Sequence, residues 1–186
     1  MASIKLTGDT SGEITISAPA VAGTSTLTLP TGTGTIITDT APKTGNVIQV
    51  VNATYSTVTG ISSTSYTDSG ITTSITPSST SSKILIIVSI SGRVYSQQNG
   101  DRTYTQNIVR GATQVHENAS LLQSGTGLNG YAVYPIKDMT YLDSPSTTSS
   151  TTYKVQFKVD NTANDTSMRI NEASGVSTIT LMEIAG

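Results

Sequence analysis

The chain has 186 residues, a formal net charge of −2 and only 12% charged residues. It contains 34 Thr and 26 Ser, so about a third of it consists of small hydroxyl residues, whereas an average globular domain is about a quarter charged. A net charge near zero gives no electrostatic attraction to phosphate backbones, so we expect no nucleic-acid binding. With no Cys and a single His, the chain has no thiol nucleophile, disulfide framework or zinc finger.

Membrane insertion and secretion are not expected either. The longest uninterrupted apolar run covers residues 84–88, far short of the roughly 18 residues that a membrane-spanning helix needs. The N-terminal residues MASIKLTGDTSGE lack the apolar region of a secretory signal. These features, with the absence of Cys, predict a protein made in a reducing cytoplasm.

The composition favours an all-β fold. Thr, Val and Ile are abundant and eight Tyr are present, and these residue types fit a pleated, half-buried surface. Helix formers are few, and no window has apolar residues at helical spacing between capping residues. Disordered chains, by contrast, are poor in β-branched and aromatic residues.

Residues 1–46 are predicted to form a separate N-terminal β segment. Short alternating strands are expected at residues 4–6, 14–16, 27–29 and 36–37, divided by Gly and Pro. Each strand has about two Ile or Leu, and strands with so little apolar cover are marginal alone. We therefore expect this segment to pack against copies of itself or another protein; the alternative is a flexible tail.

Residues 47–186 are predicted to form a β-sandwich or jelly-roll domain after a hinge at residues 41–46. The run at residues 84–90 is almost continuously apolar, which predicts a central strand covered on both faces. Many short strands separated by turn signals favour a sandwich. We expect nine strands, at residues 47–54, 71–75, 83–95, 102–110, 112–116, 131–141, 152–160, 167–171 and 177–184.

Motifs that could support catalysis or metal binding are weak. His116 is the only candidate for a Ser-His-Asp base, and no Gly-x-Ser-x-Gly turn accompanies it. Asp138 and Asp143 could form a carboxylate pair, although a solvated loop is the favoured interpretation. Residues 160–165 are rich in Asp and Asn and could hold Ca²⁺, although such stretches usually serve turn geometry. The sequence therefore predicts no enzyme, no catalytic or metal-binding residues and no cofactor.

Two further patterns are candidates for binding sites. Residues 30–34, Pro-Thr-Gly-Thr-Gly, lack the third glycine and the following helix of a nucleotide loop. The tyrosines of the larger region could anchor sugars or protein partners if exposed, but core positions are the favoured interpretation for Tyr95, Tyr104, Tyr131, Tyr134 and Tyr141.

Residues 4–39, IKLTGDTSGEITISAPAVAGTSTLTLPTGTGTIITD, resemble a motif near the start of exterior virion proteins of tailed bacteriophages. The shared pattern is a Gly-Ser/Thr-Gly turn, an alternating strand, Ala-Pro-Ala-x-Ala-Gly, a second strand ending in Leu-Pro, and Gly-Thr-Ile. Stretches that begin at Ile75, Tyr141 and Thr178 are similar to the jelly-roll tips of such proteins, which resemble tumour-necrosis-factor-like trimers.

The resemblance implies a non-enzymatic homotrimer on the virion exterior. Residues 1–46 would attach it to the major capsid protein or another virion protein, and residues 47–186 would project as a knob. A chain this short leaves no room for a long shaft, which favours a capsid decoration (cement) protein or short head fibre. A tail-fibre tip that binds a host glycan or protein remains the alternative, and a carbohydrate-binding or carbohydrate-degrading jelly roll a third.

Overall fold

The computed structural model describes residues 3–7, 12–17, 20, 23–24, 42–95, 102–123, 132–133, 136–160 and 166–186. The chain divides into two compact units, Met1–Ile36 and Ile37–Gly186. Strands expected at residues 27–29 and 36–37 lie outside the described residues. Within the described ranges there is no helix long and apolar enough to span a membrane.

The described residues of the first unit include an antiparallel hairpin. It consists of β1 (Ser3–Thr7) and β2 (Glu13–Ser17), which agree with the strands predicted at residues 4–6 and 14–16. The register pairs Ile4 with Ile16 and Leu6 with Ile14. Because directly opposed residues share a face of a sheet, the apolar positions of the two strands coincide.

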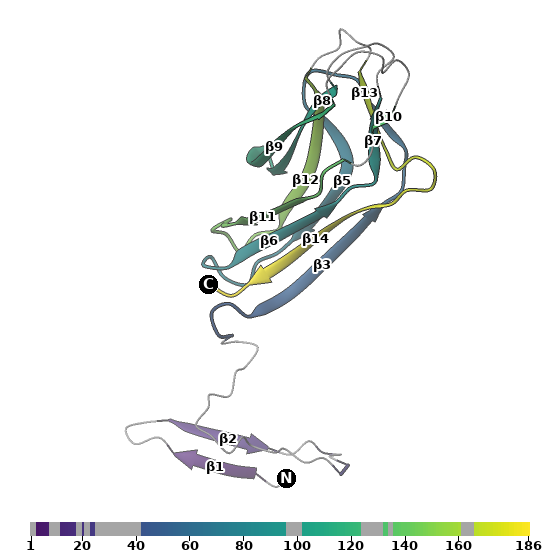
Figure 1. Ribbon diagram of the computed structural model, residues 1–186. Coiled ribbons are helices and arrows are strands. Elements are labelled where there is room, and N and C mark those ends of the chain that lie inside the picture. The colour runs from purple at the N-terminus through teal and green to yellow at the C-terminus, as the bar shows by residue number, and fades with distance from the viewer. Residues whose placement is uncertain are drawn as a thin grey trace. The chain divides into compact units, whose positions relative to one another are not determined.

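The second unit is a two-layered all-β sandwich, as the sequence predicts (Figure 1). One layer is the sheet β5-β12-β8-β9. Its strands are β5 (Thr67–Ile75), β8 (Arg102–Arg110), β9 (Thr113–Gln123) and β12 (Thr151–Val159). We call it the polar-faced sheet, because most of its described outward side chains are hydroxyls, amides and charged groups; Val109, which pairs with Lys154, is an exception.

The other layer consists of two four-stranded sheets, and each strand of one sheet is connected along the chain to the strand at the same place in the other. The lower sheet, β11-β6-β14-β3, continues along the chain into the upper sheet, β10-β7-β13-β4. The lower strands are β3 (Val47–Tyr55), β6 (Lys83–Ser89), β11 (Met139–Asp143) and β14 (Ser177–Ile184). The upper strands are β4 (Thr59–Ile61), β7 (Gly92–Tyr95), β10 (Ala132–Val133) and β13 (Ser167–Ile170).

The connections follow the jelly-roll scheme. If each lower strand and its upper continuation count as one, the described part of the second unit has eight strands, which follow one another between the two layers in the order of a jelly roll. The structure therefore splits two predicted strands: residues 83–95 become β6 and β7, and residues 131–141 become β10 and β11. The first break occurs where the Ile90 amide donates to Asp138 (2.8 Å) and the Ser91 carbonyl accepts from Asn171 (2.8 Å). These contacts replace ladder bonds, so the strand ends there.

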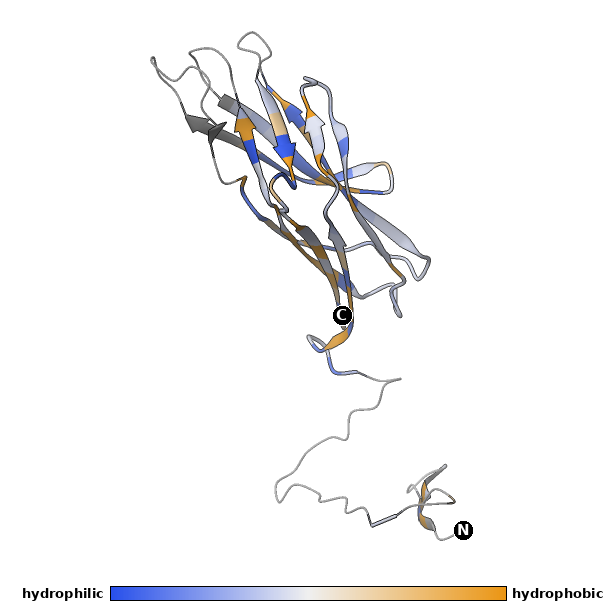
Figure 2. Cartoon of the chain, turned by 90° about the vertical axis from the view of Figure 1, so that its right-hand side faces the viewer, coloured by the Kyte–Doolittle hydropathy of each residue, from blue (hydrophilic) through white to orange (hydrophobic). Residues whose placement is uncertain are grey.

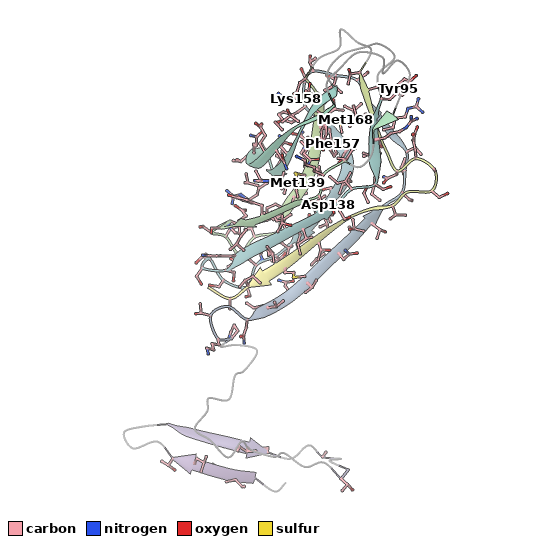
Figure 3. All side chains as sticks on the ribbon, in the orientation of Figure 1. Tyr95, Asp138, Met139, Phe157, Lys158 and Met168 are labelled. Atoms are coloured by element: carbon pink, nitrogen blue, oxygen red, sulfur yellow. The ribbon has the colours of Figure 1, made fainter. Side chains whose placement is uncertain are left out.

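The core lies between the layers and is formed by alternate residues of the strands. Figure 2 shows hydrophobic residues, in orange, on strands of this domain among more hydrophilic ones. Its largest fully buried side chains include Tyr104, Tyr153, Phe157, Met139 and Met168. The labelled Phe157, Met139 and Met168 in Figure 3 come from both layers. A core of this composition explains how a domain without Trp encloses an apolar interior.

The two open edges of the sandwich are closed by aromatic contacts. At one edge, Gly70 (φ +87°) lies beneath Tyr55, whose ring occupies the space a Cβ would take. The ladder between β5 and β12 shifts register next to this glycine, as at a β-bulge. At the other edge, the His116 ring stacks on Tyr141 with centroids 5.0 Å apart.

Within one chain, β6 is covered on one of its faces, whereas the sequence predicts cover on both. The strand is central, since it pairs with β11 and β14, and Ile84, Ile86 and Val88 are buried. Ile87, however, points outward and is 36% exposed. A continuous apolar run therefore marks here a strand with one core face and one apolar outer face.

Candidate functional site

The β1-β2 hairpin presents an uncovered apolar face. Ile4, Leu6 and Ile16 are 64%, 55% and 48% exposed, and the register places Ile4 directly opposite Ile16. Lys5 and Thr15 pair on the opposite face. A two-stranded sheet with no apolar cover is at best marginally stable in water, so this face requires a partner.

The hairpin belongs to the segment that the sequence singles out for attachment. That segment was expected to end at residue 46, whereas the boundary between the compact units falls after Ile36. Gly45 and Asn46 make backbone hydrogen bonds to Ala185, of 2.8 and 2.9 Å. These two residues therefore contact the residue that follows the C-terminal strand of the larger unit.

His116, the only candidate catalytic base, occupies a structural position. It is half-buried on β9 and stacks on Tyr141 of β11. Within the described part of the chain, no hydrogen bond joins His116 to a serine or a carboxylate. The stacking accounts for the residue type, because a flat ring at the sandwich edge covers apolar surface and keeps its nitrogens near solvent.

Asp138 and Asp143 do not form a carboxylate pair. They lie at opposite ends of β11, about 17 Å apart along the strand, beyond the separation that glycoside hydrolysis uses. Asp138 accepts hydrogen bonds from the Ile90 amide (2.8 Å) and the Ser89 hydroxyl (3.4 Å). Its role is to hold the break between β6 and β7.

Asp143 is buried and part of a polar cluster inside the sandwich. Its Oδ2 accepts hydrogen bonds from the Tyr153 hydroxyl and Arg110 Nη1, both at 2.7 Å. Burial raises the pKa of the Tyr153 phenol, and its hydrogen bond to the charged Asp143 raises it further. The phenol therefore stays protonated and acts as a donor, which marks the cluster as structural.

The Asp/Asn-rich stretch at residues 160–165 lies outside the described residues except for Asp160. That carboxylate accepts a hydrogen bond from the Thr105 hydroxyl at 2.7 Å and lies 3.9 Å from Lys158 Nζ. Among the described residues there is no group of three or more His, Cys, Asp or Glu side chains arranged to hold a metal ion. The loop at residues 30–34 also lies outside the described part of the chain.

Tyr104 and Tyr141 take core or edge positions, whereas Tyr95 lies half-buried on the outer face of the upper sheet, because its neighbour Val94 is fully buried. Tyr104 is fully buried, and its hydroxyl accepts from the Lys137 amide at 2.9 Å. Tyr141 packs against the core. Tyr95 lies on β7 in the upper sheet, with the Arg93 guanidinium 5.5 Å from its ring centroid (Figure 3). Tyr131 and Tyr134 lie outside the described residues.

A charged cluster that the sequence analysis missed lies on the upper sheet. Arg93 of β7 and Arg169 of β13 are directly opposed, a like-charge pair that is unfavourable by itself. Glu172 accepts from both, at 2.8 Å from Arg169 Nη1 and in a closer contact with Arg93 Nε. The cluster depends on cross-strand register, which sequence periodicity does not supply.

This cluster gives the domain a predicted acid sensitivity. The hydrogen bonds from Arg93 and Arg169 lower the pKa of Glu172 from 4.5 to about 2. A carboxylate whose pKa is lower in the folded state than in the unfolded state stabilises the fold at pH values above its unfolded pKa. That contribution is lost as the pH falls from 4.5 toward 2. We expect Glu172→Gln to lower the free energy of unfolding by about 1 kcal/mol at pH 7 and by less at pH 3. Urea unfolding at both pH values tests this, and a deficit that stays constant would contradict the assignment.

A serine-lined pocket lies at the other end of the domain. It has a volume of about 390 Å³ and is lined by Pro42, Ile48, Ser78, Ser79, Ser81, Ser82, Ala185 and Gly186. Glu183 Oε1 accepts from the Ser78 amide, the Ser78 hydroxyl and the Ser82 hydroxyl at 2.6–2.7 Å. The carboxylate is therefore already saturated by its own chain, and the pocket presents mainly serine hydroxyls.

Comparisons with known proteins identify no family. No family model matches the chain, and no curated protein matches it. Similar solved structures include the VP2 subviral particle of infectious bursal disease virus, at 12% identity and a TM-score of 0.31, with 77% of this chain and 39% of that chain covered. Structures of the Gt and Gx strains of that virus give 13% and 11% identity, TM-scores of 0.29 and 0.28, and coverage of 97% and 98% of this chain.

These similarities carry no argument about function. This chain spans less than half the length of each of the three structures, at 39%, 46% and 46%, and the TM-scores are too low to indicate a shared fold. What the residues themselves define is an all-β protein in which a hairpin with an uncovered apolar face precedes a sandwich domain with its own core.

Proposed function

We propose that this chain is a non-enzymatic structural protein of the exterior of a tailed-phage virion, a trimeric capsid decoration protein or short head fibre. Residues 1–46 attach it to the major capsid protein or another virion protein, and residues 47–186 project from the surface. The observation that carries the proposal is the apolar face of Ile4, Leu6 and Ile16, which is uncovered in one chain.

Two properties support separate roles for the N-terminal segment and the sandwich domain. The core residues all belong to the sandwich domain and none to the hairpin, so the larger unit does not need the hairpin in order to bury an interior. The hairpin, in contrast, gains stability only by association. The resemblance of residues 4–39 to the start of phage exterior proteins points to the same role for the N-terminal segment.

Locating the protein in a virion tests the proposal. We expect a density map of the phage that encodes this chain to show threefold knobs on the capsid lattice, with the N-terminal segment against the shell. Density on the tail alone would contradict the decoration role and favour the tail-fibre tip, in which the same domain meets a host glycan or protein. Absence of the protein from purified virions would contradict both.

A further inference from the structure

The outer face of the lower sheet carries an apolar row that crosses all four strands. The registers of β3, β14, β6 and β11 align Val50 with Met182, Met182 with Leu85, and Leu85 with Leu142. Val50 and Leu142, on the two edge strands, are 53% and 47% exposed. All four side chains point away from the core, because Ile84, Ile86 and Leu181, their neighbours along β6 and β14, point into it.

The next row along the sheet is also uncharged. It consists of Asn52, Thr180, Ile87 and Thr140. Asn52 donates to the Thr180 hydroxyl at 2.8 Å within the row, so its amide is partly satisfied by the same face. We call these eight residues the apolar face; none of their side chains carries a charge.

The outer face of the polar-faced sheet is different in kind. Along β12, Lys154 and Gln156 both bind Asp68, at 2.9 and 2.6 Å. The hydrogen bonds from Gln156 and Lys154 lower the pKa of Asp68, so it remains ionised at neutral pH. Farther along, Lys158 lies 5.1 Å from the Tyr66 ring centroid and 3.9 Å from Asp160. Those charged groups already have partners within one chain and suit a solvated surface.

The size of the apolar face indicates how it can be covered. Four strands and two rows of outward residues, with the rows about 7 Å apart, give an area of roughly 20 by 14 Å, or about 280 Å². A stable interface between two proteins that meet independently buries about 800 Å² on each. The face alone is therefore too small to capture a separate protein strongly, but it suffices for partners that are already held close together.

The N-terminal segment supplies that proximity if hairpins from several chains associate. Ser17, the end of β2, and Val47, the start of β3, are joined by a chain segment that spans at most about 100 Å. Sandwich domains joined in this way share an effective concentration of the order of a millimolar. In a threefold arrangement one part of this face packs against a different part of the same face on a neighbouring copy. Because none of its side chains is charged, that contact involves no like-charge repulsion, so the nearest suitable partner is another copy of the same domain.

We propose that the apolar face is buried against other copies of this chain and forms the contact between their sandwich domains. This inference rests on the self-association in the proposed function, but it assigns a specific surface, which that function does not. It also explains why β6 combines a core face with a second apolar face, in place of the alternating polar pattern of a solvated sheet.

Thiol accessibility in the full chain tests the proposal, because the sequence has no Cys. Single substitutions Leu142→Cys and Val50→Cys place a thiol on the apolar face at its two edge strands. Ser74→Cys is the matched control, since Ser74 is an exposed residue on an edge strand of the opposite sheet. Each rate of maleimide modification is divided by the rate of the same variant in denaturant, and the mass of each variant is measured by light scattering.

We expect a trimer in which Leu142→Cys and Val50→Cys react about tenfold more slowly than Ser74→Cys, because modification requires the face to open. A trimer in which all three thiols react equally fast would overturn the proposal and leave the trimer of the proposed function intact. Protection in a dimer would support the proposal and overturn the trimer. Slow reaction of the two face thiols in a monomer would mean that the chain's own N-terminal segment covers the face. Fast reaction in a monomer would mean that nothing covers it. Either result overturns the proposal.

Discussion

Replacing Glu183 with Ala is expected to lower the free energy of unfolding of the sandwich domain by about 3 kcal/mol. The residue is fully buried, and its carboxylate accepts hydrogen bonds from two sides. The Ser78 amide, the Ser78 hydroxyl and the Ser82 hydroxyl bind Oε1, while Gln49 Nε2 binds Oε2 at 2.6 Å. Removing the carboxylate leaves the Ser78 and Ser82 donors without this acceptor, and leaves Gln49 Nε2 with its bond to the Thr76 carbonyl (2.8 Å). It also releases the loop that precedes β6 from the C-terminal strand.

The charge of Glu183 follows from a balance of opposing effects. Burial by itself raises the pKa of a carboxyl group, but the hydrogen bonds from Ser78, Gln49 and Ser82 together outweigh it, and the pKa lies below its ordinary value. The carboxylate is therefore ionised at neutral pH and contributes stability there. That contribution is lost as the pH falls through the lowered pKa.

Two further variants show how much of the stability lost in Glu183→Ala comes from hydrogen bonds, how much from charge, and how much from removing any carboxylate. Glu183→Gln keeps the shape and one acceptor oxygen, so we expect a loss smaller than that of Glu183→Ala. Glu117→Ala removes an exposed carboxylate and should change the free energy of unfolding by about 0.5 kcal/mol or less. The measurement is urea unfolding at pH 7 with unchanged m-values. Equal stability of the Glu183→Ala variant and the original chain would show that the loop is not held by this residue.

The role of Glu183 also shows what the sequence could not reveal. The serine-rich stretch at residues 77–82 reads correctly as a connection between strands, but its serines are donors to a carboxylate about 100 residues away. Alternation along a strand identifies which residues face inward. It does not identify which inward polar residue meets which loop, because that depends on how the two layers pack.

Most strands, in contrast, could be predicted from local patterns. The alternation of Tyr, Val and Phe in β12 and of Ile and Leu in β14 matches the buried positions of those strands. The short strand β4 was missed, because only Ile61 among its three residues is a large apolar side chain. The length of β9 was underestimated, because its ladder to β8 shifts register between Ile108 and Val109 and disturbs the pattern near His116.

The candidate surfaces differ in how visible they are in the sequence. The hairpin face could be predicted because Ile4, Leu6 and Ile16 alternate with polar residues over short strands that have no other apolar cover. The apolar row could not, because its members come from four strands and only the registers align them. Both surfaces leave apolar side chains exposed in one chain, and association of several chains would cover both.

Removal of residues 1–46 is expected to leave a folded sandwich domain that no longer attaches to its virion. The core is formed by residues of the larger unit, so the cooperative unfolding of the domain should persist. The apolar face of Ile4, Leu6 and Ile16 is lost with the segment, and with it the surface that we assign to attachment. The measurement is cosedimentation with virions that lack the protein, alongside thermal unfolding followed by circular dichroism.

A second truncation makes this experiment specific. A chain that begins at residue 43 keeps the hydrogen bonds of Gly45 and Asn46 to Ala185, which the chain beginning at residue 47 loses. Two such bonds stabilise the fold by about 1–2 kcal/mol, so the longer fragment should unfold at a higher temperature. Both fragments lack the hairpin, and neither should bind virions. If both fragments bound virions as well as the full chain does, the sandwich domain would contain the attachment surface. If only the longer fragment bound, the attachment surface would lie in residues 43–46, next to Ala185, and not in the hairpin.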